Sequence, residues 1–284
     1  MIKMTLKDFN LEKISRSGQC FRLNPREREE KTYALIAFGE YLEIKQQGEE
    51  ITFSCTWETW ESRWKAYFDC GTDYSRIYAS VDQTDAYMEK AVHFGSGIRI
   101  LRQELFETVI CFIISQQNNI PRIKKCVEAL SSGFGERRVN FRGEKYYVFP
   151  TPEQLAAMPL SEYKQCNLGY RDKYIKETAG MFAGGKIDEK RLPQMKYEEA
   201  KEELMKLYGV GVKVAECICL FSLHHTDAFP IDTHIRAVLD KYYPDGFPLS
   251  RYQGYAGILQ QYAFFYDLYG EKEAFSSAQE LAKR

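Results

Sequence analysis

Apolar and polar residues alternate along the first part of the chain. The segments YALIAFG, EYLEIKQ and EITFSC, between about residues 20 and 55, have period two and are rich in β-branched and aromatic residues, a pattern typical of half-buried strands. The sequence QQGEE between the last two segments is typical of a hairpin turn. We therefore expect a small antiparallel sheet in this part of the chain.

From Glu58 onward the apolar residues recur at spacings of three and four, which predicts amphipathic helices over ETWESRWKAYFDC and QTDAYMEKAVHF. IRILRQELFETVICFIISQQ, residues 98–117, is long and apolar enough to predict one central buried helix. Further helices are predicted in IPRIKKCVEALSSGFG, which has Pro121 in its first turn, in TPEQLAAM, which has capping-box spacing, and in KYEEAKEELMKLYG.

The glycines of GSG, Gly95 and Gly97, separate the two patterns. We predict an N-terminal antiparallel sheet domain with flanking helices over residues 1–95 and a mainly helical region over residues 96–284. The expected fold class is α+β.

Composition and charge limit the function classes. The formal net charge of −1 gives no global signal for a polyanionic partner, so nucleic-acid binding would have to rest on a local surface or on backbone amides. The eight cysteines are scattered without a C-x-x-C pair, which argues against a disulfide framework or a zinc ribbon. Because the start of the chain lacks an apolar signal region and no apolar run is long enough to cross a membrane, we expect a soluble cytoplasmic protein.

The sequence LYGVGVK joins two predicted helices through Gly209 and Gly211, and the hairpin covers about residues 200–225. Glycines allow a positive φ and a close backbone approach, and the amides that open the second helix present a positive dipole end. Such a helix-hairpin-helix turn binds a DNA phosphate through amides rather than through side-chain charge. A tight turn between two buried helices, without a ligand, is the structural alternative.

Three ionisable residues lie within this hairpin or shortly after it along the chain. Lys213 lies one turn into the second helix, among apolar neighbours. It is either a lysine whose amine extends to solvent or a half-buried, nucleophilic amine. Asp232, in FPIDTHIRAVL, is a natural N-cap, and a carboxylate at that place also stabilises positive charge or moves protons. His234 is either a capping histidine or a phosphate contact.

GVGVK followed downstream by PIDTH resembles the catalytic signature of the helix-hairpin-helix DNA glycosylases, and specifically of the 8-oxoguanine DNA glycosylases. The resemblance continues in order along nearly the whole chain through SGQCFR, FIISQQNNIPRI, LGYRDKYI and AGILQQYAFF. It implies a TBP-like N-terminal sheet domain followed by a helical HhH-GPD catalytic core. It also implies a bifunctional glycosylase and AP lyase acting on duplex DNA that contains oxidised guanine.

The resemblance assigns roles to residues of this chain. Lys213 attacks the anomeric carbon and forms a Schiff base, and Asp232 aids departure of the base. The expected base-binding residues are Gly18, through its carbonyl, Cys217 and Phe264, which hold the base between them, and Gln260, which reads its Watson–Crick edge. The expected DNA-binding residues are Gln117, Asn118, Arg122, Tyr170, Arg171, Gly209, Gly211, Val214 and His234, the last oriented by Asp267.

The chain departs from the family pattern at several places. Gln117 stands where the first of three consecutive asparagines is common, so the residue that fills the void left by the flipped base is open. Cys20 replaces a hydroxyl residue, and Pro121 comes directly before Arg122. No cysteine quartet for an iron–sulfur cluster is present. We expect no cofactor, no catalytic metal, no membrane partner and a monomer, with a structural cation at the hairpin carbonyls left open. A glycosylase for another lesion and a non-catalytic DNA-binding module are the alternatives.

Overall fold

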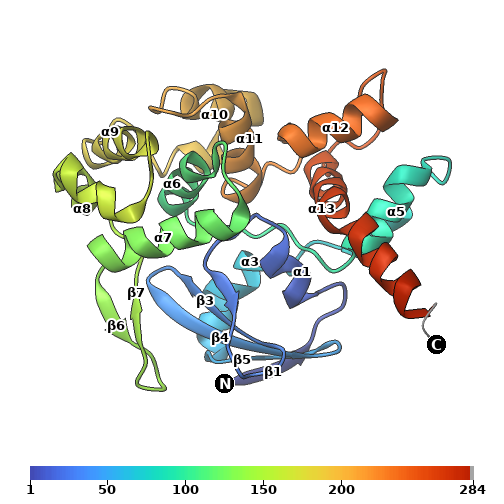
Figure 1. The fold of residues 1–284 in the computed structure, drawn as a ribbon, viewed down its shortest axis with the longest axis horizontal. Coiled ribbons are helices and arrows are strands. Elements are labelled where there is room, and N and C mark those ends of the chain that lie inside the picture. The colour runs from blue at the N-terminus through green and yellow to red at the C-terminus, as the bar shows by residue number, and fades with distance from the viewer. Residues whose placement is uncertain (282–284) are drawn as a thin grey trace.

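The computed structural model describes residues 1–281, with side chains to residue 270. Its main sheet is antiparallel, with the strand order β1-β5-β4-β3-β2 (Figure 1). The strands are β1 (Ile2–Thr5), β2 (Leu23–Pro25), β3 (Thr32–Ala37), β4 (Glu40–Gln47) and β5 (Glu50–Phe53). Leu35 and Leu42 are register partners, and both are buried, as are Ile44 and Phe53. The alternation read from the sequence is thus the buried face of this sheet, and the predicted N-terminal antiparallel sheet is confirmed.

A continuous helical stretch covers the buried face of the sheet. It runs through α2 (Trp57–Thr59), the π-helical turn η1 (Trp60–Trp64) and α3 (Lys65–Tyr67), and α1 (Leu11–Arg16) adds to the same core. Aromatic rings contribute to the contact: the ring centroids of Phe53 and Trp60 are 4.6 Å apart, and those of Phe53 and Phe68 are 5.6 Å apart. Large rings bury much apolar area, which lets this small sheet keep a core of its own.

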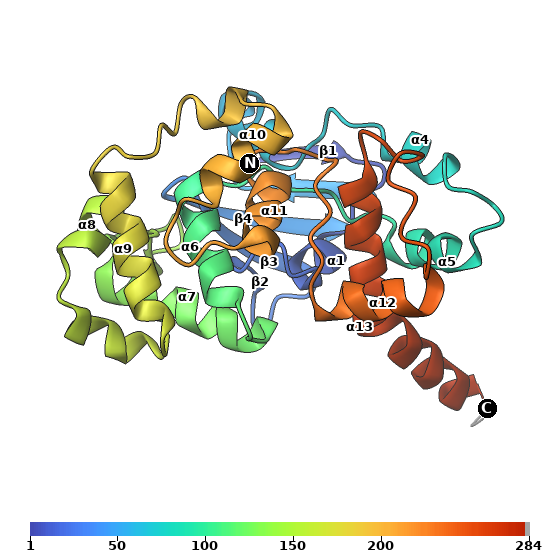
Figure 2. The same ribbon diagram turned by 90° about the horizontal axis from the view of Figure 1, so that it is seen from above.

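The rest of the chain is mainly helical and builds a second, larger core. Its helices are α4 (Tyr74–Ala79), α5 (Ala86–Gly95), α6 (Leu105–Ser115), α7 (Ile120–Phe134), α8 (Pro152–Ala157), η2 (Leu160–Cys166), α9 (Arg171–Ala183), η3 (Leu192–Gln194), α10 (Tyr197–Leu204), α11 (Val212–Phe221), α12 (Thr233–Tyr242) and α13 (Ala256–Leu281). Helix α6 packs against α7, α9 and α11 (Figure 2). Within residues 1–281 no helix is long and apolar enough to cross a membrane. The domain boundary near residue 95 stays a prediction.

The single long helix predicted over residues 98–117 is wrong in its first part, because the helix begins only at Leu105. The preceding segment is extended, and its backbone N–H groups donate to other parts of the protein: Ile100 to the Tyr74 hydroxyl at 2.8 Å, Leu101 to Gln19 Oε1 at 2.8 Å, and Arg102 to the Tyr67 carbonyl at 2.9 Å. Apolar composition predicted burial correctly, but these tertiary partners replace the helical hydrogen bonds.

Two local predictions about the helices agree with the structure. Thr151 and Gln154 form a complete capping box at the start of α8, with the side chain of each bonded to the backbone of the other. Pro121 lies in the first turn of α7, where its missing N–H removes no helical bond.

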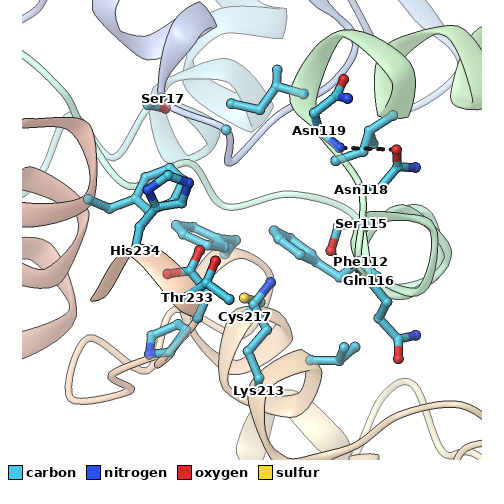
Figure 3. Close-up of a pocket in the computed structure, with 18 of the residues that line it drawn as sticks. Ser17, Phe112, Ser115, Gln116, Asn118, Asn119, Lys213, Cys217, Thr233 and His234 are labelled. Carbon is cyan, nitrogen blue, oxygen red and sulfur yellow. Dashed lines mark hydrogen bonds between the residues drawn. The ribbon is translucent and has the colours of Figure 1, made fainter. Parts of the chain in front are cut away.

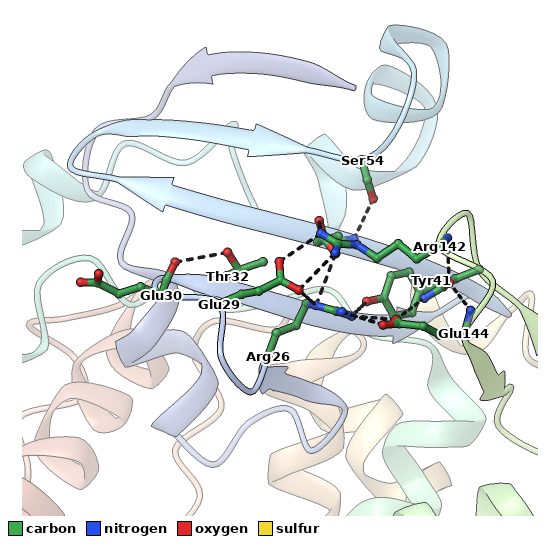
Figure 4. Close-up of polar contacts among 10 residues, drawn as sticks. Arg26, Glu29, Glu30, Thr32, Tyr41, Ser54, Arg142 and Glu144 are labelled. Carbon is green, nitrogen blue, oxygen red and sulfur yellow. Dashed lines mark hydrogen bonds and ion pairs between the residues drawn. The ribbon is translucent and has the colours of Figure 1, made fainter.

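A small two-stranded sheet, β6 (Arg137–Val139) and β7 (Lys145–Tyr147), was not predicted from the sequence. Its turn is fastened to the main sheet by ion pairs shown in Figure 4: Arg26 Nη2 lies 2.8 Å from Glu144 Oε1, and Arg142 Nη2 lies 2.6 Å from Glu43 Oε1 and 3.0 Å from Glu29 Oε2. These contacts join the helical part to the N-terminal sheet.

A buried carboxylate, Asp69, joins the end of α3 to two distant segments. It is only 1% exposed, and it contacts Arg102 Nη2 at 2.9 Å, the Tyr74 hydroxyl at 2.9 Å and His224 Nε2 at 3.3 Å. Burial by itself raises the pKa of Asp69, but hydrogen bonds and attraction from His224 and a bond from Arg102 outweigh it and lower the pKa from 3.8 to about 2.

We predict that Asp69→Asn lowers the free energy of unfolding by about 2 kcal/mol at neutral pH. Since the pKa of this carboxyl is lower in the folded state, its contribution is present above the unfolded pKa and is lost as the pH falls from about 4 to about 2. Urea unfolding of both proteins across this range should show the difference shrinking with acidification. Asp240→Asn, at an exposed position of α12, is the control. A difference that stays constant with pH would contradict the assignment.

Candidate active site

A cavity of about 720 Å³ opens where five segments meet. Its walls come from the turn before β2, the loop between α6 and α7, the first turns of α11 and α12, and the middle of α13 (Figure 3). Of the residues predicted to be catalytic or base-binding, all line this cavity: Lys213, Asp232, Gly18, Cys217, Gln260 and Phe264. Residues far apart in the sequence thus share one concave site, the usual form of a binding site for a small planar group.

The turn of the hairpin begins after α10 and ends at Gly211, the N-cap of α11. Gly209 has φ +80°, and a Cβ there would lie 2.7 Å from the Tyr174 ring, so both conformation and space require glycine. Gly211 and Val212 are exposed at the start of α11, and this N-cap makes no side-chain hydrogen bond to the first-turn amides. Exposed helix-opening amides of this kind form an anion site. Val214 is only 3% exposed as a whole residue, so its side chain is not available to DNA.

Lys213 and Cys217 lie one helical turn apart on α11 and face the cavity (Figure 3). The Lys213 Nζ atom lies 5.6 Å from the centroid of the Phe112 ring, which stacks on Phe221. Burial raises the pKa of the Cys217 thiol to about 11, and the neighbouring Lys213 only partly offsets this. The thiol is therefore neutral at physiological pH and offers an uncharged, polarisable surface to a planar ligand.

Asp232 caps α12: its side chain accepts a hydrogen bond from the N–H of Ile235 at 2.9 Å, as predicted. The segment before it is fastened by Glu216, a buried carboxylate of α11 that accepts from the Phe229 N–H at 3.0 Å and from the Tyr197 hydroxyl at 2.5 Å. The sequence pattern did not single out Glu216. An acidic residue in the largely apolar VKVAECICLF, where Lys213 is the other charged residue, was the signal that could have identified it.

Gly18 lines the cavity with φ +78°, and a Cβ there would meet Ile120 Cδ1 at 3.2 Å and Phe264 Cε1 at 3.3 Å. Its neighbours fix the turn, since Gln261 Nε2 donates to the Ser17 carbonyl at 2.9 Å. Within the described residues the Gly18 carbonyl accepts no hydrogen bond. A backbone acceptor is therefore held rigidly in the wall of the cavity.

Helix α13 carries the other side of the site. Gln260 Nε2 donates to the Pro230 carbonyl at 2.8 Å, while its Oε1 is buried without a partner in the part of the chain that the structure describes. Such an acceptor favours a ligand that carries an N–H group. His234 meets the Phe264 ring edge-on, with centroids 5.6 Å apart, and its Nδ1 lies 2.7 Å from Asp267 Oδ2. The contact with Asp267 orients the imidazole and leaves Nε2 for an outside partner.

The other predicted DNA-binding side chains differ in exposure, and Gln117 and Asn118 among them also line the cavity. Gln117 and Arg122 are exposed, Asn118 Nδ2 donates to the Ile114 carbonyl at 3.1 Å, and Tyr170 is 49% exposed. Arg171 is only 4% exposed, and its guanidinium donates to backbone carbonyls. Arg171 is therefore not free, in this structure, to contact a ligand.

Two family descriptions match adjoining parts of the chain. "8-oxoguanine DNA glycosylase, N-terminal domain" matches residues 1–109, and "HhH-GPD superfamily base excision DNA repair protein" matches residues 110–246. The first covers the main sheet and reaches into α6, and the second covers the hairpin with Lys213 and Asp232.

Solved structures match over nearly the full length. The chain is 34% identical to MBOgg1, solved with a low-affinity DNA ligand, with a TM-score of 0.88 over 93% of this chain and 94% of that one. It is also 34% identical to the Clostridium acetobutylicum 8-oxoguanine glycosylase/lyase, solved with double-stranded DNA containing cytosine opposite the lesion, with a TM-score of 0.87 over 93% of each chain. Over 158 residues it is 37% identical to the N-glycosylase/DNA lyase of Saccharomyces cerevisiae. That match takes in 52% of this chain and only 42% of the longer yeast protein.

Proposed function

Because the chain belongs to the 8-oxoguanine DNA glycosylase family of the HhH-GPD superfamily, we propose that it excises 8-oxoguanine from duplex DNA and then nicks the strand as an AP lyase. The observation that carries this proposal is the meeting of Lys213, Asp232 and the Gly18 turn around one cavity, at the end of a phosphate-binding hairpin. A nucleophile, a carboxylate and a backbone acceptor are the three groups that excision of an oxidised base requires.

The chemistry begins when the lesion nucleotide leaves the base stack and enters the cavity. The unprotonated amine of Lys213 attacks the anomeric carbon of the sugar, and the bond to the base breaks with its electron pair leaving on the base. The sugar ring opens to give a protonated Schiff base on Lys213. Loss of a proton from the neighbouring sugar carbon then expels the 3′ phosphate by β-elimination, which nicks the strand.

Asp232 assists the first step electrostatically. Its carboxylate is fixed by the N-terminal turn of α12, and it stabilises the positive charge that develops on the sugar as the base departs. It also takes part in moving the proton between Lys213 and the leaving base. All these steps use groups of the chain itself, because an amine nucleophile requires no metal ion to reach its reactive state.

Recognition of the lesion base falls to the cavity walls. The Gly18 carbonyl accepts from the N–H that oxidised guanine has and normal guanine lacks, and normal guanine would set a lone pair against this acceptor. Gln260 reads the Watson–Crick edge through its unpartnered Oε1. Cys217 and Phe264 hold the two faces of the ring.

The protein contacts duplex DNA on both sides of the lesion, at the phosphates and on the opposite strand. The amides of the hairpin at Gly209, Gly211 and Val214 bind one phosphate, and His234 binds another. The exposed Arg122 and Tyr170 hold the opposite strand, where the flipped base leaves a gap. We propose that the enzyme works as a monomer.

The test is excision by the wild-type protein from duplexes that each carry one defined lesion. We expect cleavage with 8-oxoguanine opposite cytosine, and little with an alkylated adenine, an oxidised pyrimidine or undamaged guanine. Preference for one of the other lesions would replace the substrate assignment, and no cleavage of any duplex would favour the non-catalytic DNA-binding alternative.

Gly18→Ala tests the recognition of the lesion. The added Cβ meets Ile120 and Phe264 and strains a backbone with φ +78°. We therefore expect selectivity for 8-oxoguanine over guanine to fall by about tenfold or more. Gly143→Ala is the matched control, because Gly143 has φ +79°, lies in the β6–β7 turn and has nothing within 4 Å of the place that a Cβ would take. Unchanged selectivity in Gly18→Ala would count against the role of this carbonyl.

A further inference from the structure

The carboxylate of Glu216 is buried on the helix that carries the proposed nucleophile. Glu216 lies on α11 between Lys213 and Cys217 and is only 7% exposed. Unlike these two neighbours, it is not among the described residues that line the cavity. Burying a carboxylate is costly unless its oxygens are paired. The contacts of Glu216 therefore indicate what this carboxylate holds in place.

Two donors share one oxygen of this carboxylate. The Phe229 N–H donates to Oε2 at 3.0 Å, and the Tyr197 hydroxyl of α10 donates to the same atom at 2.5 Å. Burial, and then the bond to Glu216, raise the pKa of Tyr197, so its hydroxyl keeps the proton and remains the donor. Lys201 Nζ lies 3.4 Å from Oε1 and compensates the charge. With both oxygens paired, the carboxylate is held in one place.

The bond to Phe229 joins the two elements that carry the proposed catalytic pair. Glu216 comes three residues after Lys213 on α11, and Phe229 comes three residues before Asp232. In the part of the chain that the structure describes, this is the one hydrogen bond between residues 226–231 and α11. The separation of the amine and the carboxylate therefore depends on this contact.

The N-cap of α12 does not fix that separation. The bond from the Ile235 N–H holds the Asp232 carboxylate relative to α12 alone. The placement of α12 against α11 is left to the segment that Glu216 holds. A misplacement of about 1 Å caused by a residue outside the reacting groups can lower a rate by about 10²-fold. A contact that sets this placement thus affects the chemical step.

We propose that Glu216 is a positioning residue that sets the placement of Asp232 against Lys213 by holding the Phe229 backbone on α11. This rests on the proposed function and adds a residue that supports the reaction without touching the substrate. Because Glu216 acts through Asp232, its removal slows the reaction only while Asp232 itself contributes. The step that it supports is departure of the base, and binding of DNA does not depend on it.

The experiment is a double-mutant cycle on single-turnover excision of 8-oxoguanine opposite cytosine. Glu216→Leu removes the acceptor and keeps a side chain of similar volume. We expect it to lower the rate by about 30-fold in the wild-type background and by less than about threefold in the Asp232→Asn background, where the misplaced group no longer contributes. The dissociation constant for the same duplex should change by less than about threefold. It is measured with Lys213→Gln added, so that the DNA stays uncleaved.

Two further variants separate the hydrogen bond from the charge and from the stability of the fold. Glu216→Gln loses the charge but keeps an oxygen for the Phe229 N–H, so it should excise at close to the wild-type rate. Glu104→Leu is the matched control. The Glu104 carboxylate also accepts a backbone N–H from a distant segment, that of Phe38, and neither residue lines the cavity. This variant should have a lower melting temperature and an unchanged excision rate.

Tyr197→Phe keeps the test valid if Glu216→Leu does not fold. It removes one of the two donors to Oε2, so the carboxylate is held less firmly, while the bond from the Phe229 N–H remains. We expect the excision rate to fall by about threefold, and this fall to disappear in the Asp232→Asn background. The same fall in both backgrounds would contradict the proposal.

Three results of the main cycle would overturn the proposal. The first is an equal loss from Glu216→Leu in both backgrounds, which would show that Glu216 serves only the fold. The second is a wild-type rate in Glu216→Leu. The third is a loss in Glu216→Gln as large as in Glu216→Leu, which would assign the effect to the charge. Failure of the proposed function is recognised separately, because the wild-type protein would then not excise 8-oxoguanine in the same assay.

Discussion

Lys213→Gln should abolish both excision of 8-oxoguanine and covalent trapping on lesion DNA by borohydride. Borohydride reduces the Schiff base between the amine and the opened sugar, so only an enzyme that forms this bond is trapped. Glutamine has a similar length and no nucleophilic amine. We expect the single-turnover rate to fall by at least about 10⁴-fold, since removing the nucleophile removes the whole covalent path.

The variant should remain folded and should still bind lesion DNA. Lys213 is half-buried beside Phe112 and is not engaged in any ion pair among residues 1–270, so its loss leaves no charge unpaired. Lys65→Gln, at an exposed site on the N-terminal domain, is the matched control and should be trapped like wild type. Trapping of Lys213→Gln at the wild-type level would assign the nucleophile to another amine.

Asp232→Asn should lower the single-turnover excision rate by about 10²- to 10⁴-fold and leave binding of lesion DNA nearly unchanged. Asparagine is as good an N-cap as aspartate, so the start of α12 and the bond from the Ile235 N–H are kept. What is lost is the negative charge that faces the developing positive charge of the sugar. The measurement is single-turnover cleavage together with the dissociation constant for the same duplex.

Asp267→Asn is the matched control, because it also removes one carboxylate charge close to the site. Asp267 contacts His234, a predicted phosphate ligand, rather than the reacting sugar. We therefore expect its loss to weaken DNA binding more than the chemical step. An Asp232→Asn enzyme that binds less tightly but cleaves at the wild-type rate once bound would show that Asp232 serves only as a helix cap.

Some parts of this site follow from local physics and could be predicted. The N-cap at Asp232 and the glycines of the hairpin depend on backbone geometry over a few residues. The residue types at these positions are therefore enough to predict them. The sheet was predictable because the period of two survives in β3 and β4, whose inward residues pack on one face.

Other parts depend on partners far away in the sequence. The segment before α6 has the composition of a helix but is extended. Its N–H groups donate hydrogen bonds to Gln19, Tyr67 and Tyr74, which lie elsewhere in the chain, instead of to helical carbonyls. The same holds for Arg171, which motif matching placed on the DNA and the structure places beneath the α6–α7 loop. Glu216 was overlooked because its partners, Phe229 and Tyr197, lie on other segments.

The sequence by itself determined the fold class, the hairpin and the candidate catalytic pair, Lys213 and Asp232. Each can be identified from the spacing of nearby residues and from motifs that match the family in order along the chain. Only the tertiary structure decided which side chains have free donors and acceptors. It left the Gly18 carbonyl and the buried Gln260 Oε1 without a hydrogen-bond partner among the described residues, while it engaged Arg171 with the backbone of the α6–α7 loop. The physical reason is that each group can make only a limited number of hydrogen bonds. Whether a residue from a distant segment already makes them cannot be seen from the sequence around the residue itself.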